Sequence, residues 1–144
     1  MEYIKTYDSN LFKNQLTGSI FLSEDEIECK LLSGKSCKDF LLQKPYRWNE
    51  FYIIKENNIN IAFIRIFPDN SLALFATTNL NKSNLGSYIK VLIKLKKELL
   101  NRFNVLFTDT TVTHIQGNKL MKLIGYKILS KDNTTIAWFL SNKD

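Results

Sequence analysis

The chain has 144 residues, of which 44% are hydrophobic and 24% are charged, and its formal net charge is +6. This size and composition are those of a single folded domain, which we expect to span residues 1–144, and they exclude collagen-like and low-complexity chains. No apolar run approaches the roughly 20 residues that cross a bilayer, and the N-terminal "MEYIKTYDSN" lacks the layout of a signal peptide.

The charge is divided unequally along the chain. Residues 1–71 contain 9 Lys/Arg and 10 Asp/Glu, whereas residues 72–144 contain 11 and 4. A basic half can meet a nucleotide, a nucleic acid or an acidic protein surface, although exposed lysines also serve solubility alone. The two cysteines, Cys29 and Cys37, have no histidine nearby, so we expect reduced intracellular thiols and no metal site.

The first part of the chain predicts a strand followed by two helices. Residues 1–7 alternate weakly, as in a strand, and the stretch up to Phe21 has no defined pattern. "SEDEIECKLLSG" predicts a helix with a capping box formed by Ser23 and Glu26, and Gly34 ends it. Its acidic residues suit the positive end of a helix dipole, which explains them without a catalytic or metal site.

A second, shorter helix and three strands come next. Ser36 can cap "CKDFLLQK", which Pro45 stops. "NEFYIIKENNINIAFIRIFPDNSLALFATT" predicts three strands because β-branched and aromatic residues crowd its runs. Asn57-Asn58 is the expected turn between the first two.

The last part predicts a helix, a strand, a helix and a hairpin. Helical spacing of apolar residues begins after Gly86, and Lys90, Lys94 and Lys97 form a stripe on a different face of this helix. "NVLFTDTT" is the expected strand, "THIQGNKLMKLIGY" the helix closed by Gly125, and "YKILSKDNTTIAWFLS" the hairpin. The predicted class is α/β (α+β), with a mixed central sheet of about seven strands and helices on both faces.

This element order resembles the GCN5-related N-acetyltransferase (GNAT) fold. The ending "KLIGYKIL" is similar to the usual Leu-Gly-Phe helix exit of that family. The resemblance implies that the helix after the fourth strand begins with a loop that holds the pyrophosphate of acetyl-CoA through backbone N–H groups. The fifth strand and the helix after it would complete the cofactor cleft.

The stretch "NKSNLG" stands where the family has Arg or Gln, two residues, Gly, one residue, and Gly or Ala. Gly86 fits this pattern, whereas Asn81 and Asn84 replace two of its residues, and the side chain of Asn84 is expected to crowd a phosphate. Lys82 can substitute as a cation. The resemblance implies that acetyl-CoA, if bound, would contact Lys82, Asn84, Leu85, Gly86 and Ser87.

Three chemical roles of the family look vacant or altered. Counting back from Gly125 places Met121 where the family often has a proton-donating Tyr, and a thioether donates no proton. The same count places His114 at the position of a common Asn. No acidic residue lies between Asp69 and Glu98, so the fourth strand offers no carboxylate base.

Substitutes for these roles exist elsewhere in the chain. His114 is the only histidine and a candidate base, although a histidine that begins a helix more often caps or packs. Tyr88 and Tyr126 can supply a phenol, but each is more simply a packing residue.

The succession from "SEDEIECKLLSG" to the long basic helix is also similar to the small GNAT-like internal virion protein A family of short-tailed bacteriophages. That resemblance implies a non-catalytic virion or assembly protein without a bound cofactor, located in the virion or the host cytoplasm and binding other virion proteins in several copies. The candidate surfaces are the basic stripe of Lys90, Lys94 and Lys97 and an acidic face of Glu24, Asp25 and Glu28.

Two alternatives that the sequence bears on remain open beside this hypothesis, and a host-directed inhibitor is a further option on which the sequence does not bear. One is an acetyl-CoA-dependent N-acetyltransferase with a degenerate cofactor loop. The other is a nucleic-acid binder that uses the basic half, although no recognition helix or stacking platform is evident.

Overall fold

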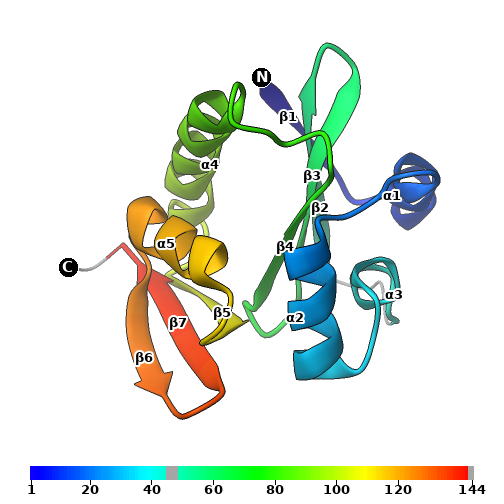
Figure 1. Ribbon diagram of the computed structural model, residues 1–144. Helices are drawn as coiled ribbons and strands as arrows, with labels where there is room; N and C mark the ends of the chain where they lie inside the picture. Colours follow the sequence, from blue (N-terminus) through cyan, green and yellow to red (C-terminus); the bar gives the residue numbers. More distant parts are fainter. Residues whose placement is uncertain (45–48, 143–144) are drawn as a thin grey trace.

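The computed structural model describes residues 1–44 and 49–142, which form five helices and seven strands (Figure 1). In chain order these are β1 (Glu2–Thr6), α1 (Ser9–Leu16), α2 (Ser23–Ser33), α3 (Cys37–Leu41), β2 (Glu50–Glu56), β3 (Ile59–Ile66), β4 (Leu72–Ala76), α4 (Leu85–Leu100), β5 (Val105–Thr111), α5 (Ile115–Ile124), β6 (Lys127–Lys131) and β7 (Thr135–Ser141). The order is the predicted one with a single addition, helix α1. The predicted helix end at Pro45 lies outside the described residues.

Helix α1 was not predicted from the sequence. Its N-cap is Asp8, whose Oδ1 accepts the backbone N–H groups of Asn10 (2.9 Å) and Leu11 (3.2 Å). Phe12 and Leu16, one turn apart, are its buried residues. With eight residues and one such pair, the helical period is too short to stand out in the sequence.

The predicted capping box at the start of α2 is wrong. Leu22 occupies the N-cap without a side-chain hydrogen bond. The carboxylate of Glu26 instead accepts the backbone N–H of Cys37 at 2.6 Å, which ties α2 to α3. A tertiary contact has therefore replaced the local one.

Other local predictions are confirmed. Asn57 and Asn58 have φ values of 51° and 64°, the left-handed conformation that a tight hairpin turn requires. Gly34 and Gly125 end α2 and α5 in the left-handed conformation, and Ser36 caps α3 by accepting the N–H of Asp39.

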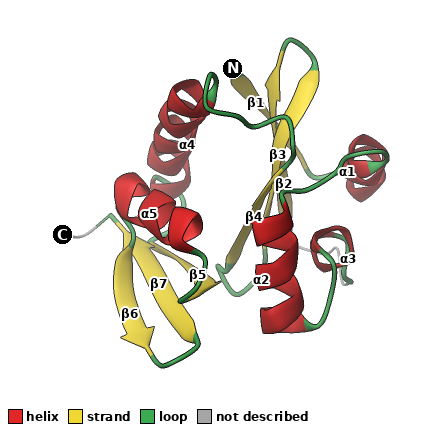
Figure 2. Cartoon of the chain, in the orientation of Figure 1, coloured by secondary structure: helices red, strands yellow, loops and turns green. Residues whose placement is uncertain are grey.

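The strands form two sheets that meet at one point. Strands β1, β2, β3 and β4 form an antiparallel sheet in that order, and β5, β7 and β6 form another. A parallel bridge between Ser71 and Phe107 joins them, supported by a hydrogen bond of 2.9 Å from Thr108 Oγ1 to the carbonyl of Leu72. Within residues 1–44 and 49–142 no ladder continues this bridge, so β4 and β5 diverge toward their carboxyl ends (Figure 2). We call residues 74–77 and 108–111 the fork.

The core lies on both faces of the first sheet. Tyr52 and Ile54 of β2 pack on the side of α4 and α5, whereas Phe51 and Ile53 pack on the side of α1, α2 and α3. All four side chains are at most 1% exposed, so β2 is buried on both faces. The predicted fold class, with seven strands and helices on both faces, is confirmed. Among the described residues, no helix combines the length and apolar character that crossing a membrane requires.

Leu106 of β5 lies at the centre of this architecture and is fully buried, whereas Leu129 of β6 is 60% exposed. We expect Leu106→Ala to lower the free energy of unfolding by about 2–5 kcal/mol, because it leaves a cavity. Leu129→Ala should change it by less than about 1 kcal/mol. Urea unfolding of both variants measures the difference, and equal losses would contradict this core.

Candidate functional site

The start of α4 presents backbone donors without acceptors. The first hydrogen bond of this helix runs from the N–H of Tyr88 to the carbonyl of Asn84, at 3.0 Å. The N–H groups of Leu85, Gly86 and Ser87 come before it and have no acceptor within the helix. These three residues are exposed, no side chain caps the helix, and its first turn has no acidic residue. Such an end attracts anions.

The loop before α4 is fixed by its own asparagines. Asn84 is buried, and its side chain accepts the N–H of Asn81 at 2.8 Å and donates to the carbonyl of Asn79 at 2.9 Å. The side chain of Asn81 in turn accepts the N–H groups of Ser83 (2.9 Å) and Asn84 (3.2 Å). The Asn84 amide is therefore held within the loop, and the expectation that it crowds an approaching phosphate stays a prediction.

Gly86 faces open space. A Cβ atom at this position would meet no atom within 4 Å, and its φ is not positive. Neither packing nor backbone conformation of the protein itself therefore demands a glycine there. Lys82 is exposed in the loop that leads into the helix. The predicted cofactor residues thus lie together, with Asn84 as a support inside the loop.

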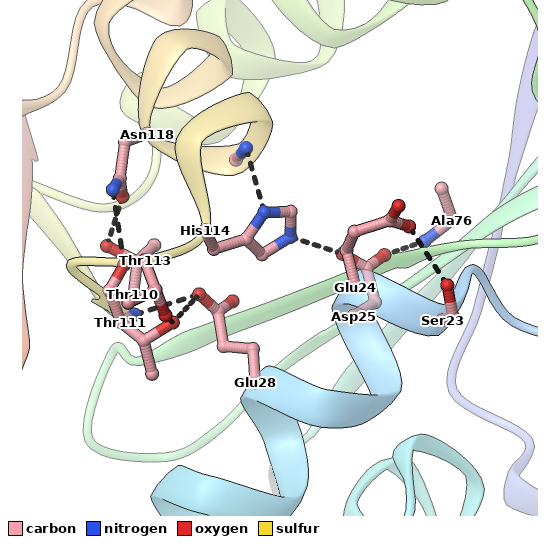
Figure 3. Close-up of polar contacts among 11 residues, drawn as sticks. Ser23, Glu24, Asp25, Glu28, Ala76, Thr110, Thr111, Thr113, His114 and Asn118 are labelled. Atoms are coloured by element: carbon pink, nitrogen blue, oxygen red, sulfur yellow. Dashed lines mark hydrogen bonds and ion pairs between the residues drawn. The ribbon is translucent and has the colours of Figure 1, made fainter.

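Two carboxylates of α2 bind the backbone at the fork (Figure 3). Asp25 Oδ2 accepts the N–H of Ala76 at the end of β4, at 2.8 Å. Glu28 Oε2 accepts both the N–H of Thr111 at the end of β5, at 2.8 Å, and its hydroxyl, at 3.2 Å. Diverging strands leave such N–H groups without a partner strand, and α2 supplies the missing acceptors.

His114 links α5 to the carboxylate of Asp25. Its Nδ1 accepts the N–H of Gly117 at 3.2 Å, which caps α5, so the proton of the neutral ring lies on Nε2. Nε2 then donates to Asp25 Oδ1 at 2.8 Å. The hydrogen bond to Asp25 raises the pKa of His114, and burial opposes this rise. Protonation at Nδ1 would also cost the cap contact with Gly117.

Glu28 is the carboxylate best placed to take up a proton. Burial raises the pKa of Glu28 above its ordinary value, against the lowering effect of the hydrogen bonds from Thr111. Its second oxygen, Oε1, accepts no hydrogen bond from the described residues. A half-buried carboxylate with one anchored and one free oxygen has the properties of a general base. Glu28 was not predicted as a base, because it reaches the fork from α2 and not from the fourth strand.

The remaining candidates for proton transfer are packing residues. Met121, Tyr88 and Tyr126 are at most 6% exposed and lie in the core beside α4 and α5. Burial raises the pKa of both tyrosines, so neither phenol ionises readily. Both ring nitrogens of His114 are hydrogen-bonded, Nδ1 to the N–H of Gly117 and Nε2 to Asp25, so neither is free to act as a base.

The predicted interaction surfaces differ in their exposure. Lys90, Lys94 and Lys97 are all exposed along α4, as the stripe requires. On α2, Glu24 is exposed, whereas Asp25 and Glu28 are half-buried and bind the fork. The expected acidic face is therefore reduced to Glu24.

No protein-family model matches the chain, and no curated protein matches it in sequence. Its structure, however, is similar to solved structures of acetyltransferases. A GNAT-family acetyltransferase from Bacillus anthracis matches with a TM-score of 0.62 and 9% identity, over 100% of this chain and 97% of that one. An N-acetyltransferase from Staphylococcus aureus Mu50 matches with a TM-score of 0.61 and 16% identity, over 98% of each chain.

The chain has the GNAT fold. A third GNAT neighbour, the N-acetyltransferase PseH of Campylobacter jejuni, was solved in complex with acetyl coenzyme A. It matches with a TM-score of 0.52 and 15% identity, over 67% of this chain and 70% of that one. These structural similarities establish the GNAT fold alone, and the narrower resemblance to phage virion proteins stays a prediction.

The single histidine of the sequence allows a direct test of the Asp25–His114 contact. In an NMR titration, we expect the imidazole of His114 to have a pKa above about 6.5 in the wild type and a lower one in Asp25→Asn, which loses the charged acceptor. Stabilisation by the pair is then complete below about pH 6.5 and is lost as the pH rises through the raised pKa. Glu24→Gln is the comparison: the Glu24 charge also raises the pKa of His114 but makes no hydrogen bond to the ring, so its removal should lower this pKa less than Asp25→Asn does. The same pKa in wild type and Asp25→Asn would refute the contact.

Proposed function

We propose that this protein is an N-acetyltransferase that uses acetyl-CoA. The observation that supports this proposal best is the uncapped start of α4. Of the helices in residues 1–44 and 49–142, it is the one with neither a side-chain cap nor an acidic residue in its first turn. An open set of N–H groups at the end of a 16-residue helix suits a diphosphate.

The residues present fit the cofactor at this end. The N–H groups of Leu85, Gly86 and Ser87 would bind the diphosphate, and Lys82 would add a positive charge. Open space in front of Gly86 leaves room for the close approach of a phosphate. Acetyl-CoA, when bound, supplies an acetyl group activated as a thioester.

The protein's own contribution to the reaction would be to remove a proton from the amine. Glu28 accepts it on Oε1, while the N–H and hydroxyl of Thr111 hold the other oxygen in place. Burial raises the pKa of Glu28 toward neutral pH, where a base can both accept and release a proton. Since Met121 donates no proton, the leaving group would be protonated by water.

The variant Ser87→Glu should weaken the binding of acetyl-CoA without weakening the fold. A carboxylate in the first turn of α4 should stabilise the helix by about 0.3–1 kcal/mol while repelling a diphosphate. We therefore expect an equal or higher melting temperature together with at least a roughly tenfold loss of acetyl-CoA affinity, measured by calorimetry.

Ser130→Glu, the same change on the exposed strand β6, is the control and should leave the affinity unaltered. We expect wild-type protein to bind acetyl-CoA more tightly than roughly 100 μM. An absence of heat at millimolar acetyl-CoA would rule the proposal out.

A second candidate is the non-catalytic role in phage assembly, through contacts with other virion proteins. The observation in its favour is that Lys90, Lys94 and Lys97 are all exposed along one helix, where they can meet an acidic protein surface. This role places the protein in the virion or the host cytoplasm and needs no cofactor.

Reversing the charge of the basic stripe tests this candidate. We expect Lys90→Glu combined with Lys94→Glu to leave thermal stability unchanged and to lower the amount of the protein in purified particles, quantified against capsid protein by mass spectrometry. Lys119→Glu with Lys122→Glu, on exposed positions of α5, controls for net charge. Equal incorporation of the two variants into particles would argue against a role of the basic stripe in assembly.

A further inference from the structure

The carboxylate of Asp25 spans the fork. One oxygen accepts the N–H of Ala76 on the β4 side, and the other accepts Nε2–H of His114, which follows β5 and begins α5. The side chains of His114 and Asp25 are only 8% and 14% exposed. A single residue of α2 thus joins the end of β4 to the start of α5, beyond the point where β4 and β5 separate.

Helix α2 itself is anchored independently of Asp25. The N–H of Leu22 donates to the carbonyl of Ala76 at 2.9 Å, and the N–H of Thr78 donates to the carbonyl of Ile20 at 2.8 Å. The chain before α2 therefore pairs with the end of β4. Because this pairing fixes the start of the helix, the Asp25 side chain can rotate away without moving α2.

We propose that Asp25 is a latch that closes the fork in the ligand-free protein and that the thioester arm of a CoA ligand must displace it. This inference rests on the proposed function and adds a regulatory step to it. The pantetheine arm of CoA carries amide and thioester carbonyl groups, which are acceptors of the same kind as a carboxylate oxygen. Such a group can take over the N–H of Ala76 only when Asp25 leaves it.

The latch lowers the apparent affinity for the full ligand. If only a fraction of the molecules has the open, binding-competent fork, the apparent affinity is the intrinsic affinity multiplied by that fraction. A substitution that destabilises the closed form increases the open fraction and so increases the apparent affinity. Among the described residues, Asp25 and His114 make no hydrogen bond to Leu85, Gly86 or Ser87, so a ligand that reaches only the start of α4 should not need the latch to open.

The experiment compares two ligands on four proteins by calorimetry. The ligands are acetyl-CoA and 3′-phosphoadenosine 5′-diphosphate, which carries the diphosphate but lacks pantetheine. The proteins are the wild type, Asp25→Asn, His114→Asn and Glu24→Gln. His114→Asn removes the partner of Asp25 without removing an acidic charge, and asparagine can still cap α5. Glu24→Gln removes one negative charge from the exposed face of the same helix.

We expect Asp25→Asn and His114→Asn each to bind acetyl-CoA about fivefold or more tightly than the wild type. Affinity for the nucleotide, and both affinities of Glu24→Gln, should stay within about twofold. Should one variant fail to fold, which thermal unfolding reveals, the other carries the test.

Wild-type binding of acetyl-CoA with no gain in either variant would overturn the latch and leave the proposed function intact. An equal gain for the nucleotide would also overturn it, since removal of charge would then explain the effect. If neither the wild type nor any variant binds acetyl-CoA, the latch and the proposed function fall together.

Discussion

Backbone N–H groups at the edges of diverging strands need acceptors, and the arrangement around the fork follows from this need. A buried donor without a partner costs about 1–3 kcal/mol. The N–H groups of Ala76 and Thr111 would lack a partner strand, because in the described part of the chain a single bridge, from Ser71 just before β4 to Phe107, connects these strands. Carboxylates of α2 supply the acceptors on both sides, which explains why acidic residues recur along the inner face of that helix.

The start of α4 is the opposite case, since its donors are left open. In this chain, asparagine side chains that often cap helices are engaged inside the preceding loop, where Asn84 holds Asn79 and Asn81. Rigidity of the loop and openness of the helix end therefore have the same cause. A preformed end of this kind loses little conformational entropy on binding an anion.

Local signals in the sequence were sufficient for most of the fold. The turn at Asn57 and Asn58, the glycine at the end of α5 and the apolar runs of the strands each act within a few residues, so they can be recognised without a structure. Helix α1 was missed because its signal is one cap and two apolar residues. The Glu26 cap failed because Cys37, eleven residues away, competes for the same carboxylate.

The site was less predictable because its contacts are distant in the chain. Asp25 meets Ala76 across 51 positions, and Glu28 meets Thr111 across 83. Acidic residues in the first turn of a helix have a sufficient local explanation, and no pattern in one sequence indicates that they bind strands elsewhere. The loop before α4, by contrast, is contiguous in the sequence, so candidate cofactor residues could be named there without a structure, and they stay a prediction.

The double-sided burial of β2 has a consequence for how the chain finds its pairing. Shifting β2 by one residue would exchange Phe51 and Ile53 with Tyr52 and Ile54, and both sets are apolar, so hydrophobicity alone scarcely distinguishes the two alignments. The two asparagines of the hairpin turn then decide the register, together with polar contacts from outside the strand, such as the hydrogen bond that Arg102 donates to the Tyr52 hydroxyl. Insertions in this hairpin should accordingly be tolerated far less than insertions in surface loops.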